Sequence, residues 1–263
     1  MLSLKLAGKT ALIGGSSQGI GLAVAQALAA QGAKCILLAR GEDKLRVACM
    51  SLEDTPPYGK HEFLVGDYSK PAELISIVRE YLFKTPIDIL INNTGGPAGG
   101  QIMNAKPEEF ISAFNQHLIC NHLLTTVVAE KMKERGFGRI INIISTYVKI
   151  PLKDLGVSNT IRGAVASWAK TMANELGQYG ITVNNVLPGA TLTERLTTII
   201  KNKAEKTGKA IQVIENEMLQ EIPARRFGKP EEIASLVAFL ATDGASYING
   251  ASIPVDGGRT GSI

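Results

Sequence analysis

The chain has 263 residues, of which 45% are hydrophobic and 20% are charged, and its formal net charge is +4. This composition is typical of a globular protein with a core large enough to need no disulfide or structural metal. The longest apolar runs are only strand-sized, which excludes a membrane-embedded protein, and no dense basic block indicates nucleic acid as a partner.

Cysteine usage and the N-terminus bear on the compartment. Cys35, Cys49 and Cys120 are odd in number and far apart, with no C-x-x-C motif. We therefore expect free thiols and no metal site. Residues 1–10 lack the long apolar stretch and the small-residue cleavage site of a secretory signal. We expect a cytoplasmic protein.

Short apolar runs rich in β-branched residues alternate with longer helical stretches. The runs are Thr10–Ile13, Cys35–Ala39, Glu62–Val65, Ile87–Ile91, Arg139–Ile144, Thr182–Val186 and Ala251–Val255. Strands separated by helices predict parallel βαβ crossovers, and continuous apolar character predicts strands covered on both faces. The sequence thus predicts one α/β domain over residues 1–263, a Rossmann-type doubly wound fold with a seven-stranded parallel sheet. Residues 190–226 are long and charged, and we interpret them as a substrate lid.

A glycine-rich segment follows the first predicted strand and leads into a helix. Its spacing, Gly15-x3-Gly19-x-Gly21, differs from the commoner G-x-G-x-x-G pattern. Glycines allow the backbone to approach a pyrophosphate, whose charge is stabilised at a helix N-terminus. The segment predicts a dinucleotide site. The predicted contacts are Gly15, Ser16, Ser17, Gly19, Ile20 and Gly21.

The residue after the second predicted strand bears on the choice of cofactor. Folds that bind NAD usually place a carboxylate there for the ribose hydroxyls, but this chain has Arg40. A planar, permanent cation suits a 2′-phosphate, which favours NADP(H). Two alternatives stay open, NAD(H) as the cofactor and Arg40 as an ordinary solvated side chain.

Further motifs occur in a fixed order along nearly the whole chain. They are Gly66-Asp67, Asn92-Asn93-Thr94-Gly95, Pro188-Gly189 with Thr193, and Val255-Asp256-Gly257-Gly258. Together with the glycine-rich segment, this set resembles the short-chain dehydrogenase/reductase superfamily, in particular its 3-oxoacyl-acyl-carrier-protein reductases. The resemblance implies a homo-oligomer, tetramer or dimer. It also implies cofactor contacts from Asp67, Asn93, Gly95, Pro188, Gly189 and Thr193.

The catalytic positions depart from the family's pattern. That pattern has a serine, a tyrosine thirteen residues later, a lysine four residues beyond it, and an asparagine on the preceding helix. This chain has Ser145 in the serine position, then Ser158 and Arg162, and His117 in place of the asparagine. A serine hydroxyl is much less acidic than a phenol and ends closer to the backbone, so Ser158 cannot replace the tyrosine as the acid. Arg162 keeps the positive charge and can donate to the nicotinamide ribose, but it does not readily lose a proton.

Replacement proton donors can be named. We rank His117 first because imidazole titrates near neutrality, although a packed helix histidine is the alternative. Tyr147 and Lys149 follow Ser145 on the next loop and are the other candidates.

Three functions fit these observations. The first is an atypical NADP(H)-dependent oxidoreductase acting on a small carbonyl or alcohol substrate, with Ser145 holding the substrate oxygen. The second is an NADP(H)-binding protein or regulatory subunit without dehydrogenase turnover. The third is a non-redox enzyme in which the glycine-rich stretch at residues 95–100 holds an anion.

Overall fold

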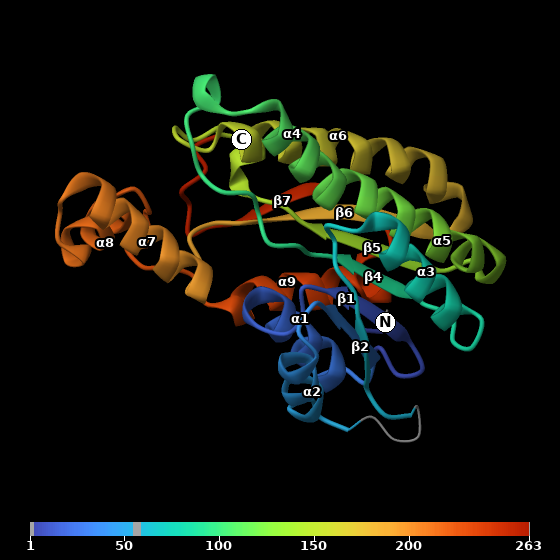
Figure 1. The fold of residues 1–263 in the computed structure, drawn as a ribbon. Coiled ribbons are helices and arrows are strands. Elements are labelled where there is room, and N and C mark those ends of the chain that lie inside the picture. The colour runs from blue at the N-terminus through green and yellow to red at the C-terminus, as the bar shows by residue number, and fades with distance from the viewer. Residues whose placement is uncertain (1–2, 55–58, 263) are drawn as a thin grey trace.

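The computed structural model describes residues 3–54 and 59–262, and its centre is a seven-stranded parallel sheet (Figure 1). The strand order is β3-β2-β1-β4-β5-β6-β7. The strands are β1 (Thr10–Gly14), β2 (Lys34–Ala39), β3 (Glu62–Val65), β4 (Ile89–Asn92), β5 (Gly138–Ile143), β6 (Ile181–Pro188) and β7 (Ser252–Val255). The order reverses between β1 and β4, which is the doubly wound arrangement. The predicted fold is confirmed, with strand ends displaced by at most a few residues.

Helices cover both faces of the sheet (Figure 1). They are α1 (Gly19–Ala30), α2 (Glu42–Met50), α3 (Pro71–Leu82), α4 (Pro107–Phe114), α5 (Cys120–Arg135), α6 (Gly156–Leu176), α7 (Glu194–Thr207), α8 (Ile211–Gln220) and α9 (Pro230–Leu240). One buried cluster joins α1, α2 and α9 to one face, and a second joins α3, α5 and α6 to the other. Because helices cover both sides, every residue of β1, β5 and β6 is buried. No helix within the described ranges combines the length and apolar character needed to cross a membrane.

The segment predicted as a lid, residues 190–226, contains two helices. α7 and α8 are joined around Gly208, whose φ of +68° allows the tight turn. Leu196, Ile200 and Ile214 form a small buried cluster between the two helices. In Figure 1 this pair extends away from the helices that cover the sheet. Because α7 and α8 pack mainly against each other, the pair forms a small substructure of its own on the domain.

A line of buried asparagines crosses four strands. Asn92, Asn142 and Asn185 occupy paired register positions on β4, β5 and β6, and Ser252 on β7 continues the line. Each amide nitrogen donates to the next side-chain oxygen, at 2.9, 2.9 and 3.0 Å. Buried polar side chains are stable in a core only when they are hydrogen-bonded. This asparagine line therefore fixes the register of four strands.

We predict that Asn142→Ala destabilises the protein by about 2–4 kcal/mol, because it leaves the buried amides of Asn92 and Asn185 without their partner. Urea unfolding monitored by circular dichroism measures the change. Asn202→Ala is the matched control, because Asn202 is exposed on α7, and its expected change is below about 0.5 kcal/mol. Equal unfolding midpoints for the two variants would show that the asparagine line does not stabilise the sheet.

Candidate functional site

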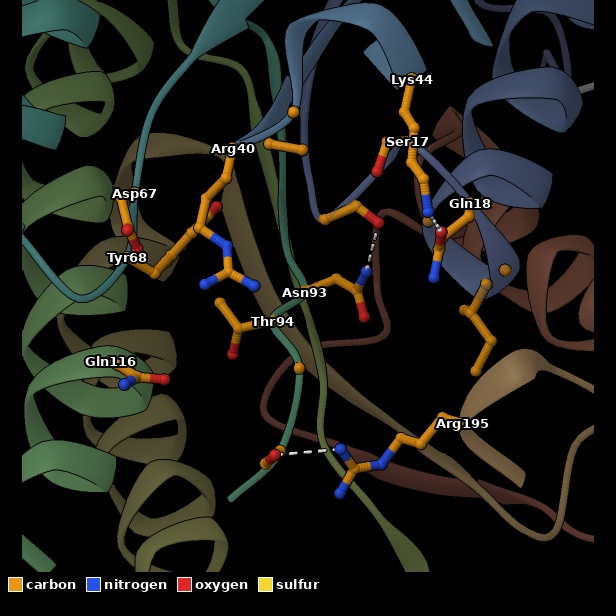
Figure 2. A pocket seen from close by; sticks show the side chains of 18 of the residues that line it. Ser17, Gln18, Arg40, Lys44, Asp67, Tyr68, Asn93, Thr94, Gln116 and Arg195 are labelled. Atoms are coloured by element: carbon orange, nitrogen blue, oxygen red, sulfur yellow. Dashed lines mark hydrogen bonds between the residues drawn. The ribbon is translucent and has the colours of Figure 1, made fainter. Parts of the chain in front are cut away.

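A cleft of about 840 Å³ lies at the carboxyl ends of the central strands (Figure 2). Ligand sites in doubly wound folds occur at this edge, next to the point where the strand order reverses. Most of the predicted cofactor residues line the cleft. They are Gly15, Ser17, Gly19, Ile20, Gly21, Arg40, Asp67, Asn93, Gly95 and Thr193.

The glycine-rich loop is shaped by close backbone contacts. Gly15 and Gly19 have φ values of +56° and +59°, which side chains rarely tolerate. A Cβ at Gly21 would lie 2.2 Å from the Gly15 carbonyl oxygen. α1 begins at Gly19, and the Gln18 side chain does not cap it. The first N–H groups of the helix are therefore not occupied by a side-chain cap beside the cleft, which suits an anionic ligand.

Two side chains near this loop brace it. Asn93 lies just after β4, and its Nδ2 donates to the carbonyl oxygens of Gly14 and Gly15, at 3.0 and 3.4 Å (Figure 2). Ser16, predicted with the cofactor residues, has its side chain engaged elsewhere. Its buried hydroxyl donates to the Ile13 carbonyl at 2.7 Å and accepts from the Leu38 N–H at 3.0 Å. The Ser16 side chain thus joins β1 to β2 and does not line the cleft.

Two cations, Arg40 after β2 and Lys44 on α2, line the cleft. Arg40 is exposed there, and Lys44 donates to the Gln18 side chain at 3.0 Å. Neither cation forms an ion pair among the described residues. Asp67 lies nearby, and a hydrogen bond from the Ser69 backbone, with a smaller contribution from Arg40, lowers the pKa of its carboxyl group. Lys44 was not predicted, and the only sequence signal is its position four residues after Arg40.

Of the predicted cofactor contacts at and after the end of β6, Thr193 lines the cleft and Pro188 and Gly189 do not. Thr193 caps α7 by accepting from the Leu196 N–H, and its methyl group faces Gly19 across the cleft. Pro188 ends β6, and the Gly189 N–H donates to Val255.

His117 lies in a π-helical turn, η2 (Asn115–Ile119), that leads into α5, and it does not line the cleft itself. Its Nδ1 is 2.6 Å from the Thr94 hydroxyl, and its side chain is only 4% exposed. Burial first, then the charges of Arg162 and Arg195, lowers the pKa of His117 to about 3. The expectation that His117 titrates near neutrality is therefore wrong, because the imidazole is neutral at physiological pH. Thr94, its partner, was not predicted as a functional residue.

Arg162 and Ser158 lie one turn apart on α6, and both are buried. Arg162 Nη1 donates to the carbonyl oxygens of Ile144 and Ile143, at 2.7 and 3.4 Å. Burial and the nearby Arg195 cation lower the pKa of Arg162 to about 10, so it stays charged at neutral pH. Ser158 is 4% exposed and does not line the cleft.

Ser145 follows β5 and is 8% exposed. Its Oγ accepts a hydrogen bond from the Tyr147 N–H at 3.3 Å, which leaves the hydroxyl proton available. Tyr147 lies in a short turn, η3 (Thr146–Val148), and its phenol is close enough to Arg162 and Arg195 to raise the pKa of both slightly against the effect of burial. Arg195, on the first turn of α7, was not predicted. It donates to the Gly96 carbonyl oxygen at 2.9 Å (Figure 2).

Comparison with known proteins identifies the family. Residues 15–260 match the family model described as Enoyl-(Acyl carrier protein) reductase. The NADPH-dependent reductase BacG of Bacillus subtilis is 32% identical over 256 residues, which cover 97% of this chain and 99% of BacG. This chain belongs to the short-chain dehydrogenase/reductase family. The 3-oxoacyl-[acyl-carrier-protein] reductase FabG of Vibrio cholerae, 34% identical over 97% of this chain and 98% of its own, is another similar member.

Solved structures agree with this short-chain dehydrogenase/reductase assignment. The L-sorbose reductase from Gluconobacter frateurii, crystallised with NADPH and L-sorbose, has a TM-score of 0.91 and 31% identity, with 99% of each chain covered. YwfH, described as an NADPH-dependent reductase involved in bacilysin biosynthesis, also has a TM-score of 0.91 and 31% identity, covering 97% of this chain and 99% of its own. The resemblance inferred from the motifs is thus confirmed at the level of the family.

The depressed pKa of His117 predicts a pH-dependent stability. Between the pKa of about 3 in the folded state and that of about 6.5 for an unfolded histidine, the unfolded chain binds more protons. Stability therefore falls as the pH drops through this range. From pH 7 to 4.5 the free energy of unfolding should decrease by about 2–3 kcal/mol more in the wild type than in His117→Asn.

Urea unfolding of both proteins at several pH values measures this difference. Asparagine does not titrate, so groups other than His117 contribute equally to the two curves. Parallel pH dependences would show that His117 is protonated as easily in the folded protein as in the unfolded chain.

Proposed function

We propose that this protein is an NADP(H)-dependent oxidoreductase that reduces the carbonyl group, or oxidises the alcohol, of a small molecule. The observation that carries the proposal is that a cleft suited to a dinucleotide lies next to a hydroxyl group suited to a substrate oxygen. One part offers uncapped helix N–H groups and glycines to a pyrophosphate, with cations beside it. The end of β5 next to it offers the Ser145 hydroxyl. The NADPH-dependent reductases among the relatives support the same cofactor.

The residues present fit NADP(H). The glycine loop would hold the pyrophosphate, since a side chain at Gly21 would fill the space that the loop needs. Arg40 and Lys44 would bind the 2′-phosphate, and Asp67 would accept from the adenine amine. Thr193 would contact the nicotinamide half of the cofactor. When bound, NADP(H) supplies or accepts the hydride.

Arg40→Asp tests the assignment of the phosphate end. Loss of a charge-assisted contact, with a carboxylate in its place, should raise the Kd for NADPH about 10- to 100-fold. The Kd for NADH should change much less. Fluorescence titration with each cofactor measures the ratio. Arg79→Asp is the matched control, because Arg79 is exposed on α3 and does not line the cleft. An unchanged ratio in Arg40→Asp would exclude Arg40 as the phosphate ligand.

Ser145 is the residue we propose for binding the substrate oxygen. Its Oγ already accepts from the Tyr147 N–H, so its own proton can point toward a carbonyl oxygen. We propose Tyr147 as the proton donor. Among the candidates, Ser158 is buried and its hydroxyl is a weak acid, and His117 is neutral and bonded to Thr94, whereas the Tyr147 phenol lies near both guanidinium groups. The catalytic set that we propose would be an atypical one for the family.

With an active carbonyl substrate, Ser145→Ala should lower kcat about 100-fold, and Tyr147→Phe should lower it by ~10² or more. Stopped-flow and steady-state measurements of NADPH oxidation test both variants. Their Kd for NADPH should stay within about twofold of the wild type, because neither side chain lines the cofactor cleft. Tyr179→Phe, in the turn η4 (Gly177–Tyr179) after α6, is the control.

Two results would argue for other functions. Tight NADPH binding with no turnover of a broad carbonyl panel would favour a binding protein or regulatory subunit. Full turnover by Ser145→Ala would show that Ser145 does not hold the substrate oxygen.

We also propose that α7 and α8 form a lid over the substrate. Two contacts join the base of α7 to the cleft: Gln18 donates to Glu194 at 2.9 Å, and Arg195 binds the loop after β4. In addition, we propose a cytoplasmic homo-oligomer, tetramer or dimer. Exposed apolar side chains such as Ile111 and Tyr247 are consistent with subunit contacts, and sedimentation velocity measures the oligomeric state.

A further inference from the structure

We infer that Arg162 and Arg195 together form a binding site for a carboxylate of the substrate, so that the substrate is a short 2-oxo or 3-oxo acid or the corresponding hydroxy acid. The inference rests on the proposed reductase function, which places the reacting carbonyl at Ser145. It goes beyond that function by naming the chemical class of the substrate and the residues that select it.

The two guanidinium groups converge on Gly96, in the loop that follows β4. A Cβ built on Gly96 would lie 2.7 Å from Arg195 Nη2 and 2.9 Å from Arg162 Nη2. The two terminal nitrogens therefore approach the same small volume, one from α7 and the other from α6. Any side chain at position 96 would occupy this volume, so glycine is what keeps both groups accessible there.

Each guanidinium group is anchored by one nitrogen and keeps donor capacity on the other. Arg162 Nη1 donates to the Ile144 carbonyl oxygen, and Arg195 Nη1 donates to that of Gly96. Arg162 Nη2 makes no hydrogen bond within the described residues, and Arg195 Nη2 makes only a 3.3 Å bond to Pro97. Anchored, planar donors with unused N–H groups match the two oxygens of a carboxylate.

The pair has no compensating negative charge from the part of the chain that the structure describes. The ion pairs found there include neither Arg162 nor Arg195. Arg162 is more than nine-tenths buried, where water screens its charge weakly. The neighbouring His117 is neutral and adds no charge to the pair. An anion that bridges the pair would reduce the repulsion and accept charge-assisted hydrogen bonds at the same time.

The position of the pair favours a group on the substrate over the cofactor pyrophosphate. The glycine loop follows β1, whereas Arg162 is anchored to the end of β5, two strands away in the sheet. That separation is roughly 10 Å at the usual spacing of strands. The Ile144 carbonyl that anchors Arg162 directly precedes Ser145. A carboxylate held by the pair is therefore within a few bonds of a carbonyl held by Ser145, which specifies a 2-oxo or 3-oxo acid.

Paired substrates test the inference. The panel consists of 2-oxo and 3-oxo acids of four to nine carbons, each compared with its methyl ester, and NADPH oxidation is followed. For the wild type, kcat/KM should be at least tenfold higher for an acid than for its ester. Arg195→Gln should remove most of this preference, and Arg162→Lys, which keeps a charge but loses the planar fork, should reduce it. Arg79→Gln removes an equal charge from an exposed site on α3 and should leave the preference intact.

A binding measurement separates failure of this inference from failure of the proposed function. Calorimetry with the NADP⁺-loaded protein, which cannot reduce the oxo acids, should show binding of the same acids that weakens at least tenfold in Arg195→Gln. Binding without turnover would support the carboxylate site and contradict the reductase function. Turnover of esters as efficient as that of acids would overturn the carboxylate site and leave the reductase function standing. A Kd for NADPH that rises in Arg195→Gln as much as the Kd for the acid would overturn it too, by assigning the pair to the cofactor.

Discussion

The line of hydrogen bonds from Asn92 through Asn142 and Asn185 to Ser252 is the constraint on which the site depends. Parallel strands can slip in register, and a slip of one residue would move every following side chain to the opposite face. Three buried amides at paired positions make such a slip costly, because each would lose its partner. The loops after β4, β5 and β6 consequently start at a fixed edge. Thr94, Ser145 and Gly189 are held at that edge by the same line.

The surroundings of Arg40 and Arg162 determine which further charges can lie beside each of them. At the cofactor end, exposure to water allows both Arg40 and Lys44 to line the cleft without a counter-ion among the described residues. Near Arg162, burial makes each further positive charge expensive. The His117 imidazole is compatible with this second site only as the neutral form, and its bond to the Thr94 hydroxyl suits that form. Thr94 and His117 are thus joined in one contact that keeps the imidazole neutral.

The features that could be predicted from the sequence are those determined by short segments of the chain. The seven strands, the glycine loop and the position of Arg40 could be predicted because apolar periodicity and turn residues are encoded within short segments. The contacts that define the substrate end could not. Arg195 meets Gly96 across 99 residues of chain, and only the folded sheet brings α7 to that loop. Ser16 was grouped with its neighbours in the loop, although its side chain turns back into the sheet.

The His117 interpretation failed for a different physical reason. An imidazole titrates near neutrality in water, but its pKa in a protein depends on burial and on neighbouring charges. Neither the burial of η2 nor the presence of Arg162 and Arg195 beside it can be read from the residues around position 117. Local sequence names a titratable group, whereas the tertiary structure determines its protonation.

The chemistry of arginine limits what the Arg162 cation can do. A lysine can lose its proton and take part in proton relay, whereas a guanidinium remains charged even with a pKa lowered to about 10. Its contribution is therefore electrostatic and directional, through N–H groups fixed by the Ile144 carbonyl. With a neutral carbonyl compound, the buried Arg162 and the exposed Arg195 would both stay without an anion, whereas the oxo acid that we propose would pair with them as it binds. The protein would then discriminate against a neutral carbonyl compound because that ligand leaves the arginines unpaired. Leaving polar groups of a site unpaired penalises a wrong ligand more strongly than a lost apolar contact does.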